Sequence, residues 1–172
     1  MRERFRIMMQ TVGFRAGLLI ALSTWAMAWL LVRLGYNPFG QFRLLLSVTT
    51  IAGMAWALWK YRRDDNQGRL NVTDGWVAGV GIGMLNATLY SMAVWAWTSN
   101  GAVWQLYVQG LLAELEQGSA TIVKHYGQQQ LETLRQGILD TTPSYLAGFL
   151  WFTRFLWSVL CAFLVSLYYR TS

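Results

Sequence analysis

Residues 75–98 read GWVAGVGIGMLNATLYSMAVWAWT, a run of 24 residues without a charged side chain. A helix rises about 1.5 Å per residue, so about 20 apolar residues cross the roughly 30 Å hydrocarbon core of a bilayer. Lipid offers no water to the backbone, and a single span must therefore satisfy its own peptide groups as an α-helix. This stretch predicts a transmembrane helix and places the chain among integral membrane proteins.

Three further uncharged runs have the lengths of membrane-crossing helices. Residues 16–32 give 17 residues, residues 44–59 give 16, and residues 141–169 give 29, interrupted only by Arg154. The chain of 172 residues is 55% hydrophobic and 13% charged, about half of the roughly 25% charge that is typical of soluble domains. We therefore predict a single-domain, all-α, polytopic membrane protein with four transmembrane helices, at about 13–33, 42–61, 75–98 and 144–169.

Small residues recur every four positions along residues 75–98 and so share one face of the predicted helix. Helices in lipid associate mainly through close backbone approach, since apolar side chains gain little by leaving the acyl chains. The first helix offers a matching face through Gly13, Gly17 and Ala21. Two interpretations stay open: the faces pack within the chain, or they form a surface for another subunit. The small residues that recur every four positions, here called the α-helical ladder of residues 75–98, are Gly75, Gly79, Gly83, Ala87 and Ser91.

The flanking Lys and Arg residues predict the orientation. Nine of them lie in the N-terminal segment, in residues 60–74 and at Arg170, against four in the remaining flanks. Both termini and the loop 60–74 are thus expected in the cytoplasm, and residues 99–142 on the outer side. The first run is interpreted as a retained helix and not as a signal peptide, because its apolar sequence continues through residues 29–32, beyond the small residues at 26–28.

Residues 99–142 have the pattern of two amphipathic helices. After Gly118-Ser119 a second apolar stripe begins, with Gly127 as its gap. We expect both helices to lie on the outer membrane–water boundary or to cover the bundle. Thr142 and Pro143 then predict the start of the last span. The first stripe consists of Trp104, Tyr107, Val108, Leu111, Leu112 and Leu115, and the second of Val123, Leu131, Leu134 and Ile138.

Residues suited to catalysis, metal binding or nucleic-acid binding are scarce. His125 is the only histidine and Cys161 the only cysteine, so no motif of metal-binding spacing exists. Residues 79–83, GVGIG, lack the spacing of a dinucleotide loop. The net charge of +6 gathers at the ends of apolar runs and forms no basic stripe, which argues against nucleic acid. We predict a protein that is not an enzyme, with no cofactor and no metal.

Arg154 is the one charge that interrupts an apolar run, within residues 151–157, WFTRFLW. An ionisable residue in a span is a candidate functional residue, and transport sites usually pair it with an acid. None of the eight acidic residues lies in a predicted span. A proton relay or a buried ion pair is therefore not expected within this chain.

Counting 20 residues back from Tyr168 places Arg154 about 7–8 Å inside the outer boundary of the apolar core. At that depth the side chain is expected to snorkel toward outer phosphates, or toward Glu114 and Glu116. Trp151 and Trp157 lie three residues to either side and are the expected cation–π partners. These three residues are the candidate lipid or partner contact.

The order of several short motifs carries a family resemblance. The second run ends in Y61-R62-R63, and G68-R69-L70-N71 leads into the small-residue-rich third helix. A long outer segment follows, and the last helix ends in Y168-Y169-R170. Over nearly its whole length the chain resembles the bacterial DUF 4199 family, four-helix integral membrane proteins typical of Bacteroidota. That family has no established function, so the resemblance implies a topology and a bacterial inner membrane, and no catalytic residues.

The sequence offers surfaces for helix packing but few residues suited to catalysis or metal binding, and this contrast leads to a functional hypothesis. We expect a non-enzymatic accessory or structural subunit in the lipid bilayer, whose small-residue faces and outer helices dock other protein subunits or a second copy. The alternative is a small transporter or channel subunit, which the missing intramembrane acid disfavours.

Overall fold

The computed structural model describes residues 13–39, 43–65 and 70–169, and the regular elements within them are all helical. The α-helices are α2 (Phe14–Arg33), α3 (Arg43–Lys60), α4 (Val72–Thr98), α5 (Ala102–Tyr126), α6 (Gln128–Asp140) and α7 (Pro143–Tyr168). A π-helical turn, Tyr61–Asp65, continues α3. The predicted all-α class is confirmed.

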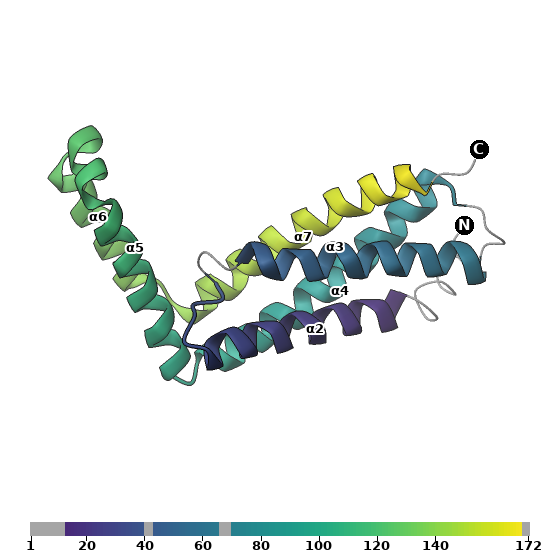
Figure 1. Cartoon of the computed structure of the whole chain (residues 1–172), viewed down its shortest axis with the longest axis horizontal. Coiled ribbons are helices and arrows are strands. Elements are labelled where there is room, and N and C mark those ends of the chain that lie inside the picture. The colour runs from purple at the N-terminus through teal and green to yellow at the C-terminus, as the bar shows by residue number, and fades with distance from the viewer. Residues whose placement is uncertain (1–12, 40–42, 66–69, 170–172) are drawn as a thin grey trace.

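Four helices form an elongated bundle, and the other two leave it crosswise at one end (Figure 1). The bundle contains α2, α3, α4 and α7, while α5 and α6 pair as a hairpin, here called the outer arm. Of the described helices, α2, α4 and α7 are long and apolar enough to cross a membrane. The 18-residue α3 is not among them. By length and composition the structure thus supports the predicted helical membrane protein with three candidate spans, whereas the sequence predicted four.

A seam of small residues joins α4 to α7. A Cβ added at Gly75 would lie 2.6 Å from the Ser166 hydroxyl oxygen. Cβ atoms added at Gly79 and Gly83, the next two glycines of the ladder, would also collide with α7 side chains. Each step of four residues along α4 matches four residues back along α7, so the helices run antiparallel in one constant register. The pairs along this seam are Gly75 with Ser166, Gly79 with Ala162 and Gly83 with Ser158.

The partner of the α4 ladder differs from the expected one. The sequence contains a second small-residue ladder at positions 158, 162 and 166, and this ladder on α7 is what meets α4. The first helix contacts α4 differently, since a Cβ added at Gly17 would meet the Leu85 side chain at 2.9 Å. Gly13 is buried at the start of α2. The ladder of α4 is therefore occupied inside the chain.

Local capping explains where α4 and α7 begin. The Asn71 side-chain oxygen accepts a hydrogen bond from the Thr73 backbone N–H at 3.3 Å, and α4 starts three residues before the predicted position. At α7 the Thr142 hydroxyl oxygen accepts from the Tyr145 N–H at 3.2 Å, with Pro143 in the first turn. The predicted start of the last span is thus confirmed to within a residue.

The outer arm breaks at a different glycine from the one expected. The sequence suggested an interruption at Gly118-Ser119, yet α5 continues through both residues to Tyr126. The Ser119 hydroxyl donates to the Glu116 carbonyl within the helix. The turn falls at Gly127, whose φ of +84° lies in the region that glycine adopts without strain. The apolar stripes of α5 and α6 face each other, with Leu112, Leu115 and Leu131 around one small shared pocket.

The buried apolar residues of the bundle form two clusters. The cluster nearer the outer arm includes Ala28, Leu46, Tyr90 and Leu150. The cluster nearer the other end includes Ile20, Met54, Ile82 and Ala162. Between these clusters the four helices carry polar side chains, and this level contains Arg154.

Candidate functional site

A layer of polar residues crosses the middle of the bundle. Each of its members lies four residues from apolar core residues on its own helix, as Asn86 does between Ile82 and Tyr90. The four uncharged members are at most 2% exposed, so they face the interior of the bundle and not lipid. This polar layer consists of Thr24 on α2, Thr50 on α3, Asn86 on α4, and Arg154 and Ser158 on α7.

Part of the layer is satisfied by short hydrogen bonds. The Thr24 hydroxyl donates to the Ile20 carbonyl at 2.7 Å, and its oxygen lies 2.8 Å from the Thr49 hydroxyl oxygen. This contact joins α2 to α3. Threonine commonly bonds back to its own helix in this way, and so it can lie in a membrane helix without an unpaired polar group.

Arg154 contacts two other helices of the bundle. Its Nη1 donates to the Thr50 hydroxyl oxygen at 3.3 Å. Its Cζ lies 3.6 Å from the centre of the Tyr90 ring, so the guanidinium covers the face of that ring. The side chain is half-buried, and its polar interactions within the described residues are with Thr50 and Tyr90. One arginine thus connects α7 to α3 and α4.

The expected environment of Arg154 needs correction. Within the described residues it forms no ion pair with Glu114 or Glu116, and both acids are exposed on the outer arm. Trp151 stacks on Phe155 and donates its indole N–H to the Thr88 hydroxyl oxygen at 3.0 Å, so the cation–π partner is Tyr90 instead. Trp157 remains a neighbour, because it lines the same cavity as the arginine.

Arg154 lies near the middle of helix α7. Arg154 is the twelfth of 26 residues in α7, about 17 Å along the helix from its first residue. The helix starts at Pro143, several residues before the boundary inferred from counting. A charge near the middle of a span costs about 2.5–3.5 kcal/mol on insertion scales. Tyr90 and Thr50 offset part of this cost without neutralising the charge.

Four buried polar atoms of the bundle have no hydrogen-bond partner within the described residues. They are the Asn86 Nδ2 and Oδ1, the Tyr90 hydroxyl and the Ser158 Oγ. An unpaired buried donor or acceptor costs about 1–3 kcal/mol, and the acyl chains around a bundle supply no partner. The interior therefore has unused hydrogen-bonding capacity at the level of the arginine.

A cavity of about 360 Å³ opens beside Arg154. Its polar lining residues are Arg154, Tyr90, Ser47, Thr50 and Thr153, and its other walls are apolar. Phe149 and Trp157 are 45% and 41% exposed, so the cavity reaches the surface of the bundle. The lining residues are Pro38, Phe39, Leu46, Ser47, Thr50, Tyr90, Phe149, Leu150, Thr153, Arg154 and Trp157.

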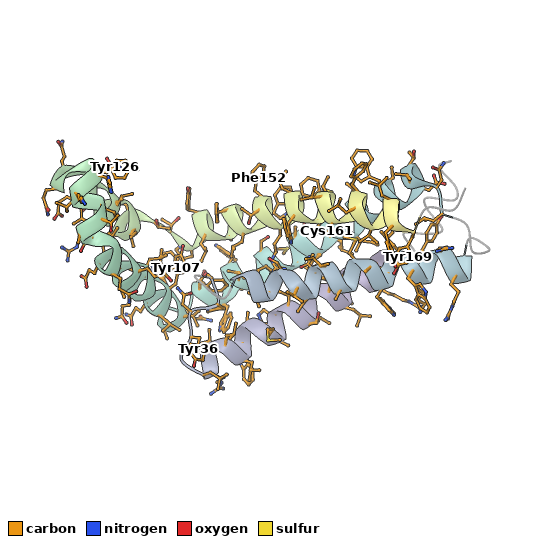
Figure 2. All side chains as sticks on the ribbon, turned by 45° about the horizontal axis from the view of Figure 1, so that its top comes forward. Tyr36, Tyr107, Tyr126, Phe152, Cys161 and Tyr169 are labelled. Atoms are coloured by element: carbon orange, nitrogen blue, oxygen red, sulfur yellow. The ribbon has the colours of Figure 1, made fainter. Side chains whose placement is uncertain are left out.

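Aromatic residues fix the outer arm to the bundle. The Phe39 ring lies edge-on to Trp97 of α4 and to Tyr107 of α5, with ring centres 6.4 and 6.1 Å apart. Half burial raises the pKa of Tyr107 above its ordinary 10.0, with Tyr145 and then Glu114 adding to the rise. Figure 2 shows Tyr107 at this junction and Tyr126 at the far tip of the arm. The junction shares Phe39 with the Arg154 cavity.

The remaining sequence candidates form no second site. His125 is exposed near the tip of the arm, beside the Tyr126 ring. Cys161 is a buried free cysteine on α7. Residues 13–39, 43–65 and 70–169 contain no cluster of three metal-ligating side chains. The arrangement around Arg154 can hold an anion, and arginine keeps its proton under physiological conditions.

Comparison of the chain with protein families, with characterised proteins and with solved structures gives no match. The resemblance to the DUF 4199 family therefore stays a prediction.

Proposed function

We propose that the chain is a non-enzymatic accessory subunit of the bacterial inner membrane, with four spans and both termini in the cytoplasm, and that its outer arm binds a partner protein. The lipid bilayer surrounds the bundle, and the partner is a different subunit or a second copy of the chain. The projecting arm is the observation that carries this proposal.

Chain direction supports α3 as the fourth span. Both α2 and α4 run toward the end that holds the outer arm, so α3 returns the chain along the bundle (Figure 1). Its 18 residues cover about 27 Å. Cations lie over tryptophan rings at both ends of the bundle. Arg33 lies over Trp29 at the end of α2, at 4.9 Å, and Lys60 lies over Trp56 at the end of α3, at 5.3 Å. Such pairs suit the two headgroup regions.

The outer arm is larger than the bundle needs. Its helices have 25 and 13 residues, and none of them is buried. The 25 residues of α5 cover about 37 Å. At its tip Tyr126 is 75% exposed and Val123 37% exposed, and Leu134 nearby on α6 is 40% exposed. An arm of this kind offers a partner a surface outside the membrane while adding little to the core of the bundle.

Charge favours a protein partner over a lipid surface. Residues 99–142 contain four acids and two bases, a net charge of −2, whereas anionic membrane surfaces attract clusters of basic residues. The same segment contains seven glutamines, all exposed. A glutamine side chain both donates and accepts hydrogen bonds, which suits the mixed polar groups of a protein surface.

The test is a photo-crosslinking residue at Tyr126 in native membranes, together with purification in mild detergent. We expect a defined cross-linked product and a co-purifying complex, whose mass distinguishes a second copy from another protein. Y126E combined with L134E should disrupt the complex. The matched control Q105E, at an exposed position near the base of the arm, should leave it intact. A lone monomer without a product at Tyr126 would overturn the proposal.

A small transporter or channel subunit is the second candidate. The polar layer and the cavity of about 360 Å³ favour it, because solute sites in membranes lie among interior polar groups. The described candidate spans contain one acid, Asp74 in the first turn of α4, and it is far along that helix from the level of Arg154, which argues against coupling to protons. Solute flux in proteoliposomes distinguishes the two candidates: flux above that of empty vesicles would support transport.

A further inference from the structure

We propose that the cavity beside Arg154 binds the anionic head of a lipid-like molecule that enters from the bilayer. This site is separate from the outer arm and does not depend on the accessory role proposed above. The shared chemistry of its ligands is a single carboxylate or phosphate attached to an acyl chain.

The register of α4 and α7 explains why the cavity lies where it does. The small-residue seam passes through Gly79 with Ala162 and Gly83 with Ser158. The next step of four residues on each helix brings Ala87 opposite Arg154. An arginine thus takes the position where the seam would continue with a small residue. The pairing of small residues ends there, although the two helices stay packed in one cluster through Tyr90, Val94 and Leu150, and the cavity opens beside Leu150 and Phe149.

The charge of Arg154 lacks a counter-charge among the described residues of the bundle. Its contacts with Thr50 and Tyr90 involve neutral groups. A guanidinium has five N–H donors, and its polar interactions within the described residues are with Thr50 and Tyr90 alone, so most of the donors have no acceptor there. Carboxylates and phosphates match the paired donors of arginine in two parallel hydrogen bonds. The missing component of the site is therefore an oxyanion.

Tyr90 holds the guanidinium beside the cavity. Tyr90 is 1% exposed and lines the cavity, and the Arg154 guanidinium lies over its ring. The Tyr90 hydroxyl is enclosed and interacts with Arg154. Tyr90 of α4 thus positions Arg154 of α7, and the guanidinium supplies the donors for a bound head.

The shape of the cavity favours an amphiphile over a free ion. Its walls are mainly apolar, and its mouth lies between exposed residues of α7 that would contact acyl chains. Phe152, on the same helix, points away from the bundle (Figure 2). At about 30 Å³ per water-sized group, 360 Å³ holds roughly a dozen such groups. A head and the first part of a chain fit inside, and the rest of the chain extends into lipid.

The experiment uses the full chain in nanodiscs of neutral phosphatidylcholine. Two diazirine-bearing probes are compared, a long-chain fatty acid and a phosphatidylglycerol, and the labelled residues are located by mass spectrometry. We expect labelling within residues 149–157 by at least one probe, and the stronger probe identifies the head as carboxylate or phosphate. Unlabelled probe of the same kind should compete, whereas its uncharged methyl ester or a neutral diacylglycerol should not.

Two variants test the role of the charge and of the space. R154Q should lower the affinity of the probe by about ten- to a hundredfold, the range expected for a lost charge-assisted hydrogen bond. T153F keeps the arginine but fills the cavity, and it should lower labelling as strongly. The control R33Q removes another arginine that covers a tryptophan ring, outside the cavity, and should change nothing.

Helicity and the elution volume of each variant establish that it is folded. If R154Q does not fold, T153F and the competition by the methyl ester still decide the question. Equal labelling of the wild type and T153F, or equal competition by the charged and uncharged molecules, would overturn the proposal.

Discussion

The contact of Gly79 with Ala162 gives the sharpest prediction about stability. A Cβ added at Gly79 would collide with the Ala162 Cβ and lie 3.2 Å from its Cα. Carbon atoms in contact prefer about 3.5–4.0 Å, so G79A forces α4 and α7 apart. Overpacking of this kind costs about 1–3 kcal/mol. The same displacement loosens the neighbouring contacts of Gly75 and Gly83.

The assay is unfolding of the purified protein in mixed micelles with increasing SDS, followed by far-ultraviolet circular dichroism. G79A should unfold at a lower SDS fraction than the wild type. The matched control is G148A on α7, because a Cβ there would meet no atom within 4 Å. G148A should leave stability unchanged or raise it slightly, since alanine favours a helix over glycine.

A double-mutant cycle makes the reasoning specific. A162G removes the opposing Cβ, and alone it costs about 0.5–1 kcal/mol because glycine weakens a helix. In combination with G79A it should restore about 1 kcal/mol or more, within the range of coupling energies for residues in contact. If G79A destabilises no more than G148A does, or if A162G fails to rescue it, the seam does not hold these helices together.

Three further outcomes follow from local geometry. T142A removes the hydroxyl that accepts from the Tyr145 N–H; it should destabilise α7 by about 0.5–2 kcal/mol, seen as faster amide exchange in its first turn, and unchanged exchange would contradict the cap. G127A places a Cβ at φ of +84° and ψ of 165°, a region almost confined to glycine, and should cost about 1–3 kcal/mol; faster exchange confined to α5 and α6 is expected, while protection equal to that of the wild type would remove the argument for a strained turn. In E114Q the pKa of Tyr107 should fall toward its ordinary value, because a negative neighbour disfavours the phenolate; ring-carbon NMR of labelled Tyr107 against pH measures this, and a pKa that does not fall would show that Glu114 has no effect.

The membrane class and most helix positions could be predicted from the sequence, because an uncharged run of about 20 residues has the length and polarity of a helix that crosses lipid. The ladder of α4 was visible through its period of four. Its partner on α7 has the same period but lies among aromatic residues, and pairing two ladders requires a register that only tertiary packing sets. For that reason the sequence offered α2 as a matching face, whereas the glycines of the α4 ladder contact α7 and Gly17 of α2 meets Leu85 of α4.

The polar layer was harder to foresee. Thr24, Thr50 and Asn86 are single polar residues within apolar runs, and the sequence does not say which of them face the interior. The orientation of Arg154 depends on Tyr90 and Thr50, which belong to other helices. Reasoning from α7 alone therefore favoured snorkelling. The turn of the outer arm was misplaced because a positive φ, which Gly127 has and Gly118 lacks, is not encoded in spacing.

We attribute the missing counter-charge of Arg154 to a bound acidic amphiphile, whose anionic head pairs with the guanidinium. Native mass spectrometry of the protein, extracted gently from its own membrane, measures this most directly. We expect the wild type to retain one acidic lipid-like molecule, whereas R154Q, folded and equally abundant, should retain none. Identical adducts on both proteins, or no adduct on the wild type after gentle extraction, would contradict it.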